Sequence, residues 1–221
     1  MSDFASHPLT LVVVIGFATL LPFAFMTLTA FVKISTVLQI VRGAIGAQSV
    51  PTNTVIIAFA GALTVLAMAP LGSRIAERAG PLLEPGSMND SAAWALGMVG
   101  ATREPLRAFL KANGSARERE RFYQIALAAR PEAERAQVGR DDLVILVPAF
   151  VVSELIGAFA LGFAIYLPFL VIDLVVSNVL LALGMQMMSP TQVSLPFKLL
   201  LFVAIDGWGL LAQTLVTGYR F

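Results

Sequence analysis

The sequence predicts an all-α fold of membrane-associated bent helical hairpins with a small inserted α-helical extracytoplasmic domain. The first observation is composition, because 57% of the 221 residues are hydrophobic and 13% are charged, against about 25% charged in a typical soluble domain. The second is that residues 73–142 hold 21 of the 29 charges, as 11 Lys or Arg and 10 Asp or Glu. The third is that four hydrophobic segments lie outside that region, each long enough to be tested against a bilayer core of about 30 Å.

Composition also excludes several classes of function. The chain has no cysteine, which excludes disulfides, thiol nucleophiles and thiolate metal sites. Its single histidine, His7, stands in the polar stretch before the first hydrophobic segment. The net charge of +1 gives no electrostatic attraction for nucleic acid. We therefore expect no cofactor, no metal and no nucleic acid, and partners that bind through apolar surface.

The first predicted unit, residues 1–72, is a hydrophobic helical hairpin. Its first segment, Pro8–Leu28, has the roughly 20 apolar residues that a spanning helix needs. A cleaved signal peptide is the alternative, but the preceding stub contains Asp3 and no Lys or Arg, which favours a retained helix. The second segment is Thr54–Gly72. A predicted loop, Lys33–Asn53, which contains several turn residues, separates the two segments.

That loop predicts the orientation of the chain. It contains two basic residues, Lys33 and Arg42, and no acidic residue, so the positive-inside rule assigns it to the cytoplasm. The charged region 73–142 is then extracytoplasmic. With four crossings both ends of the chain lie on that outer side, and the turn Met185–Gln192 lies on the inner side.

The second predicted unit is this charged region, residues 73–142, which has a helical pattern. A helix is expected over Ala92–Ala112, and Asn113-Gly114 is its stop signal. A unit this small has a thin hydrophobic core and would be marginally stable alone. We therefore expect it to pack on neighbouring subunits.

A capping box marks the start of the next helix in the charged region. Ser115 and Glu118 have the spacing at which each side chain bonds a free backbone amide of the first turn. Pro131 ends this helix. The charge run Arg117–Arg121 is interpreted as a solvated face with mixed ion pairs.

The third predicted unit, residues 143–221, is a second hydrophobic helical region. Its first segment, Leu143–Met188, has 46 residues and would extend about 69 Å as one helix, which exceeds the bilayer core more than twofold. We expect it to bend or break at Tyr166-Leu167-Pro168, because proline removes a backbone donor and disfavours helix at the preceding residue. The final segment is Val193–Thr217.

Four charged residues lie inside these last apolar segments: Glu154, Asp173, Lys198 and Asp206. A charge in hydrocarbon costs several kcal/mol, so each should pair or face water. One interpretation is a set of salt bridges between helices or subunits, and the other is a proton or ion relay. Lys198 is the only cation here, and Glu154 is the acid that we would test first as its partner. The spacing does not decide which acid Lys198 meets.

A methionine-rich turn, Met185 with Met187 and Met188, joins the third and fourth hydrophobic segments. Methionine is unbranched and flexible, so such a group can form a deformable plug in a channel. Ordinary gap-filling in a core or contact with lipid is the alternative.

Several longer motifs resemble one family. Together they are similar to the SctR/FliP family of type III secretion export-gate proteins, over about 60 residues with high specificity and more loosely over the rest of the chain. The motifs are PAFVxSEL at Pro148–Leu155, LPFLVIDLVV at Leu167–Val176, the methionine-rich turn, SLPFKLLLFVxxDGW at Ser194–Trp208, and the looser matches at Phe31–Asn53 and Pro105–Leu110. A missing signal peptide favours the virulence or symbiosis branch over the flagellar one.

The resemblance implies a non-enzymatic pore subunit in the bacterial inner membrane. It implies a homopentamer that joins the partners SctS and SctT, and also SctU and SctV, to export unfolded proteins. In such a ring Met185, Met187 and Met188 would form a methionine gasket, although Gln186 interrupts the run seen in flagellar relatives. Glu154 and Lys198 would form an intersubunit ion pair. The helices would bury against other subunits more than against lipid, and the charged domain would be periplasmic.

Two other classes of function remain as alternatives. A small ion-coupled transporter would use Glu154, Asp173 and Asp206 as a proton path through discontinuous helices. A membrane enzyme is the third choice, because the sequence shows no nucleophile with a base and no metal-binding cluster.

Overall fold

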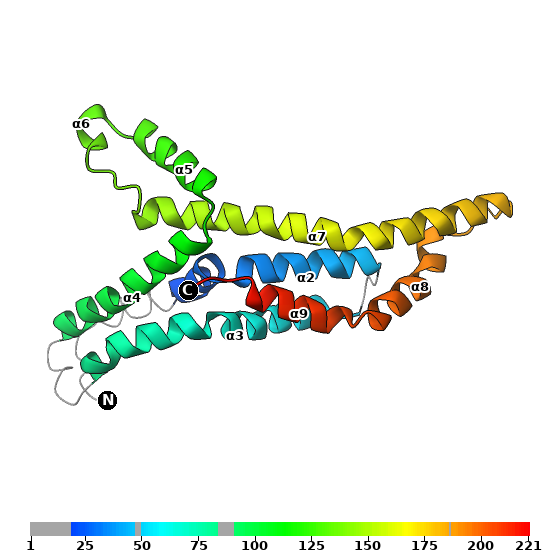
Figure 1. The fold of residues 1–221 in the computed structure, drawn as a ribbon, viewed down its shortest axis with the longest axis horizontal. Helices are drawn as coiled ribbons and strands as arrows, with labels where there is room; N and C mark the ends of the chain where they lie inside the picture. The colour runs from blue at the N-terminus through cyan, green and yellow to red at the C-terminus, as the bar shows by residue number, and fades with distance from the viewer. Residues whose placement is uncertain (1–18, 47–49, 84–90, 186) are drawn as a thin grey trace.

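The computed structural model describes residues 19–46, 50–83, 91–185 and 187–221, and these residues form helices and no strand. The molecule is elongated (Figure 1), and the predicted all-α fold is confirmed. The helices are Thr19–Leu28, α2 (Phe31–Ile45), α3 (Asn53–Ala79), the 3-10 turn η2 (Gly80–Leu83), α4 (Ser91–Asn113), α5 (Ala116–Ala128), α6 (Glu132–Arg135), α7 (Leu143–Ala182), α8 (Pro190–Ala204) and α9 (Gly207–Thr217).

Helix α2 is the centre of the fold. It lies along α7 and also packs on α3 and α8 (Figure 1). The prediction of a loop over Lys33–Asn53 is therefore wrong, because most of that range is α2, and the side of the membrane on which it lies stays a prediction. Apolar residues recur in it at helical spacing, and Ile34, Val37 and Leu38 are fully buried. Gly46, with a left-handed φ of 81°, ends the helix, and residues 47–49 lie outside the described residues.

Helix α3 confirms the second hydrophobic segment and extends it to Ala79. The Thr52 side chain caps its N-terminus by accepting a hydrogen bond from the Val55 amide. Among the described residues two helices are long and apolar enough to cross a membrane, and α3 with η2 forms one of them, over Asn53–Leu82. The other is α7.

Helix α7 is a single helix of 40 residues that continues through Pro148 and Pro168. The predicted break at Pro168 is wrong. A proline removes only one backbone donor, so the helix can continue through it. Next to this proline, Phe169 is buried against Phe202 of α8 with ring centroids 6.3 Å apart. At 1.5 Å per residue α7 is about 60 Å long.

Two bends interrupt the apolar helices. The helix Thr19–Leu28 meets α2 at 73°, just after the end of the predicted segment Pro8–Leu28, of which residues 8–18 lie outside the described residues. α8 meets α9 at 58°, inside the predicted continuous segment Val193–Thr217. At the second bend Asp206 has a left-handed φ of 51°, and a Cβ atom on Gly207 would lie 2.2 Å from the Phe202 ring. Asp-Gly is a turn signal that the prediction of one segment did not use. If each bent pair counts as one span, up to four membrane crossings are possible within the described residues.

The charged region contains the two helices that were predicted. α4 ends at Asn113, and α5 begins after Ser115 and ends before Pro131. The capping box is not formed, because the Ser115 side chain makes no cap hydrogen bond. Glu118 is instead buried, where it pairs with Arg121 at 2.8 Å. It is therefore not part of a solvated face, because α5 packs on α7 along this side.

We predict that Gly162→Ala destabilises the packing of α2 on α7. A Cβ atom at Gly162 would lie 2.7 Å from Cδ1 and 3.2 Å from Cβ of Ile40, so overpacking should cost about 1–3 kcal/mol of unfolding free energy. The control is Gly61→Ala on α3, where no atom lies within 4 Å and removing a helix glycine should leave stability unchanged or raise it by up to about 1 kcal/mol. Denaturant titration of the purified chain in detergent measures both, and equal changes would contradict the prediction.

Candidate functional site

The buried charges of the hydrophobic helices form two separate clusters. We call them the Glu154 cluster, made of Lys33, Glu154 and Tyr219, and the Lys198 cluster, made of Asp173, Ser194 and Lys198. Each contacts both α2 and α7. Each therefore fixes how those helices pack.

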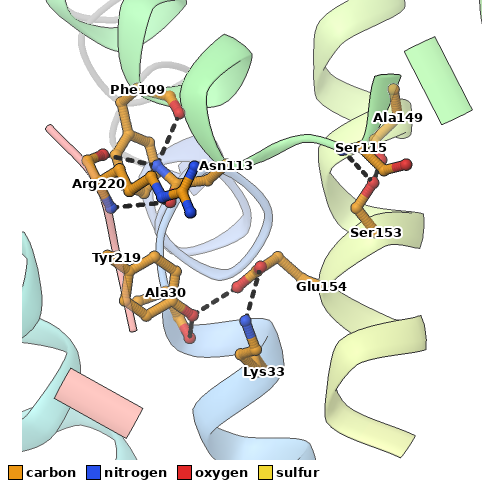
Figure 2. Close-up of polar contacts among 10 residues, drawn as sticks. All are labelled: Ala30, Lys33, Phe109, Asn113, Ser115, Ala149, Ser153, Glu154, Tyr219 and Arg220. Carbon is orange, nitrogen blue, oxygen red and sulfur yellow. Dashed lines mark hydrogen bonds and ion pairs between the residues drawn. The ribbon is translucent and has the colours of Figure 1, made fainter. Parts of the chain in front are cut away.

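The Glu154 cluster joins α2, α7 and the segment after α9 (Figure 2). Glu154 is only 3% exposed, and its Oε1 lies 3.3 Å from Lys33 Nζ. The Tyr219 hydroxyl donates a short hydrogen bond to Oε2 of Glu154, and Lys33 Nζ lies 5.2 Å from the centroid of the Tyr219 ring. A buried carboxylate is stable only with such partners, so the two contacts compensate for the loss of hydration.

The environment of Tyr219 keeps its hydroxyl protonated. Burial raises the pKa of Tyr219 well above its ordinary range, and the nearby charge of Glu154 raises it further. A neutral phenol can donate to a carboxylate at every physiological pH. Tyr219 is therefore a permanent hydrogen-bond donor in this cluster.

The Lys198 cluster joins α2, α7 and α8. Lys198 is 3% exposed, and its Nζ lies 2.6 Å from Oδ2 of Asp173, which is 28% exposed. Nζ also donates to the Ala44 carbonyl oxygen at 3.1 Å, near the end of α2. The Ser194 hydroxyl donates to Oδ1 of Asp173 at 2.5 Å. Asp173 is thus the acid that meets Lys198 within one chain, which the spacing alone had left open.

Glu154 and Lys198 are not partners within the chain. Glu154 and Asp173 are 19 residues apart on α7, so the two clusters lie about 28 Å apart along that helix. A contact between Glu154 and Lys198 of different subunits stays a prediction. The analysis of the sequence missed Lys33 and Tyr219, although a lone lysine within a long uncharged stretch was a signal for a buried ion pair.

Asp206 belongs to neither cluster. It lies at the bend between α8 and α9, and a Cβ atom on Gly209 would be 2.3 Å from its Oδ2, so its carboxylate covers the first turn of α9. Glu154, Asp173 and Asp206, the three acids of the alternative proton path, therefore do not form one cluster within the chain. Within the described ranges no three His, Asp or Glu side chains gather into a metal site.

The methionine-rich turn lies at the far end of the molecule, where α7 gives way to α8 (Figure 1). Gly184 allows the turn with a left-handed φ of 71°. The side chain of Met187 is fully exposed, and those of Met185 and Met188 are 41% and 44% exposed. Gln186 lies outside the described residues. Core packing within one chain therefore does not explain these methionines.

A broad apolar surface also covers α7, α8 and α9. Its members are large hydrophobic side chains with more than a third of their area exposed: Ile156, Phe159, Phe163, Val171, Leu174, Val175, Val179, Phe197, Leu200, Val203 and Leu210. Soluble monomers rarely expose a contiguous patch of this kind. The surface is suited to lipid or to another subunit.

We predict that Asp173→Asn destabilises the chain much more than the same change in an exposed pair. It leaves the Lys198 ammonium buried without a counter-ion, which should cost about 3–5 kcal/mol of unfolding free energy. The control is Asp141→Asn, which breaks the exposed pair of Asp141 with Lys111 (2.6 Å) and should cost less than about 1 kcal/mol. Denaturant titration of each variant in detergent measures the difference, and similar losses would show that the Lys198 cluster is not a stabilising contact.

Known proteins similar to this chain are components of secretion systems. Residues 14–215 match the model of the FliP family. The chain is 43% identical over 220 residues to "Pathogenicity-related ORF2" of Xanthomonas campestris pv. glycines, covering 100% of this chain and 99% of the relative. It is 42% identical over 219 residues to the "Hypersensitivity response secretion protein HrcR" of Ralstonia nicotianae, covering 99% and 98%.

A third relative is a translocation protein. The chain is 40% identical over 213 residues to the "Yop proteins translocation protein R" of Yersinia pestis, with 96% of both chains covered. Proteins of this family are structural components of the secretion apparatus, not enzymes. With its long apolar helices the chain is a membrane protein. The family match and these full-length similarities show that the chain belongs to the FliP family, in the SctR virulence branch, and is a component of a type III secretion export apparatus.

Proposed function

We propose that the chain is the core pore subunit of the export gate, and that its methionine-rich turn forms a gasket around the path of unfolded proteins. The observation that carries this proposal is the exposure of Met185, Met187 and Met188 at the tip of the molecule. Flexible thioether side chains can close around a channel axis, yield to a passing polypeptide and close again. A ring of such turns would limit leakage while substrate passes.

Five copies would form the ring, as the family resemblance implies. The exposed apolar surface of α7, α8 and α9 supports burial between subunits, because its residues lack partners of similar chemistry in one chain. A ring needs a contact between two different faces of the subunit. We also propose an ion pair between Glu154 of one subunit and Lys198 of the next. Glu154 would then exchange or share Lys33, and Lys198 would exchange or share Asp173, its partner within the chain.

The proposed setting is the bacterial inner membrane, with SctS, SctT, SctU and SctV as partners and unfolded secreted proteins in transit. The proposed units are 1–72, 73–142 and 143–221. The charged unit is proposed to be periplasmic by the positive-inside rule. Lys33 and Arg42, with no acidic residue between Lys33 and Asn53, support this orientation.

Assembly tests the pore proposal. Co-expression of the full chain with its SctS and SctT partners, followed by native mass spectrometry of the purified complex, should give five copies of this chain in each complex. A stable complex with any other number of copies would refute the ring. A chain that purifies only alone under these conditions would do the same.

A gasket predicts that shortening its side chains increases ion leak. The double variant Met187→Ala and Met188→Ala should raise the conductance of the assembled complex in a planar bilayer by several-fold, because alanine cannot reach the channel axis. The matched control is Met26→Ala, which truncates another exposed methionine on the helix Thr19–Leu28, away from the turn. Unchanged conductance in the double variant, with assembly intact, would mean that the methionines do not seal the channel.

A further inference from the structure

The segment Tyr219–Phe221, which follows the α9 C-cap residue Gly218, forms a strap between the Glu154 cluster and the charged region. On one face of the strap, the Tyr219 hydroxyl donates to Oε2 of Glu154. The same oxygen lies 3.3 Å from the carbonyl oxygen of Ala30, at the bend that precedes α2. The first residue of the strap therefore contacts both α7 and the start of α2 (Figure 2).

The other face of the strap is held by α4. Asn113, the last residue of α4, binds Arg220 with both of its side-chain groups (Figure 2). Its Nδ2 donates to the carbonyl oxygen of Arg220 at 2.8 Å, and its Oδ1 accepts from the Arg220 amide at 3.0 Å. The ring of Phe221 stacks on Phe109 of α4 with centroids 5.4 Å apart. Adjacent residues of the strap are thus bonded to different parts of the molecule.

The turn between α4 and α5 also reaches α7 next to Glu154. A Cβ atom on Gly114 would lie 2.8 Å from the carbonyl oxygen of Leu110 and 3.7 Å from the Cα of Phe150, so the turn approaches α7 closely. The Ser115 amide donates to Oγ of Ser153 at 2.9 Å, and Ser153 immediately precedes Glu154. This turn is therefore fixed by the strap and by α7 together.

We propose that Tyr219 and Asn113 are positioning residues that couple the charged region to the Lys33–Glu154 ion pair through the strap. A three-residue segment that is bonded on both faces can move little without breaking one of these bonds. A rotation of Glu154 away from Lys33 therefore displaces Tyr219, and with it the backbone that Asn113 holds. A partner that moves α4 loosens the buried carboxylate by the same route. This coupling concerns contacts within one chain, so a result that refutes it does not refute the pore proposal, and the reverse also holds.

The first test removes only the hydroxyl of the strap. In full-length Tyr219→Phe in lipid nanodiscs, amide hydrogen exchange of residues 110–116 should speed up by about tenfold, since a hydrogen bond to a buried charge is lost nearby. Exchange in α3 should not change. The matched control is Tyr166→Phe, which removes a hydroxyl from a tyrosine in the middle of α7. Unchanged exchange in residues 110–116 of Tyr219→Phe overturns the proposal.

The second test runs in the opposite direction and does not depend on the first variant's folding. Asn113→Ala removes the two hydrogen bonds between α4 and the strap and leaves the stack of Phe221 on Phe109. Exchange of the Ile34 amide, which bonds the Ala30 carbonyl at 3.1 Å, should also speed up. If the strap carries the effects of both substitutions, the amides of the double variant Tyr219→Phe and Asn113→Ala should exchange no faster than those of the faster single variant. An unchanged Ile34 amide in Asn113→Ala, or rates that multiply in the double variant, would show that the contacts are independent and that the strap couples nothing.

Discussion

A charge cannot stay in an apolar interior without a partner, and this constraint fixes the arrangement of α2, α7 and α8. Lys33 near the start of α2 meets Glu154 of α7. Near the end of α2, the Ala44 carbonyl accepts from Lys198, which also binds Asp173 of α7. The two polar clusters thus hold α2 against α7 at two levels. The apolar residues between them supply most of the contact area, and the charges determine its register.

The same residues explain why the surface is so apolar. Glu154, Asp173 and Lys198 are committed to interior contacts, and many large hydrophobic side chains are exposed on the outer faces of α7, α8 and α9. Such faces need a nonaqueous neighbour. In an export apparatus the other subunits and the membrane are the available neighbours, and the shape of the chain, with an exposed methionine-rich turn at one end and the charged region at the other, gives the subunit two chemically different ends.

The all-α class, the described parts of the apolar segments and the two helices of the charged region could be predicted, because hydropathy and stop signals are local properties of the sequence. The interruptions could not be predicted in the same way. Pro168 was a reasonable site for a break, yet α7 continues through it. The last segment bends at Asp206, which has a left-handed φ of 51°, and the Phe202 ring leaves no space for a side chain at Gly207. Pairing of Lys198 with Asp173, and of Lys33 with Glu154, depends on tertiary contacts that spacing does not encode. The family resemblance, in contrast, depends on long local motifs, so the family could be recognised without a structure.

The unbroken length of α7 has a consequence for biogenesis. A helix of about 60 Å overruns a hydrocarbon layer of about 30 Å by roughly half its length, and tilting cannot absorb an excess of that size without lowering the whole helix into the interface. Newly made chains therefore carry apolar surface that lipid alone cannot cover. Their lifetime as monomers is limited by aggregation and proteolysis, so balanced synthesis of the subunits and prompt assembly are requirements of this architecture.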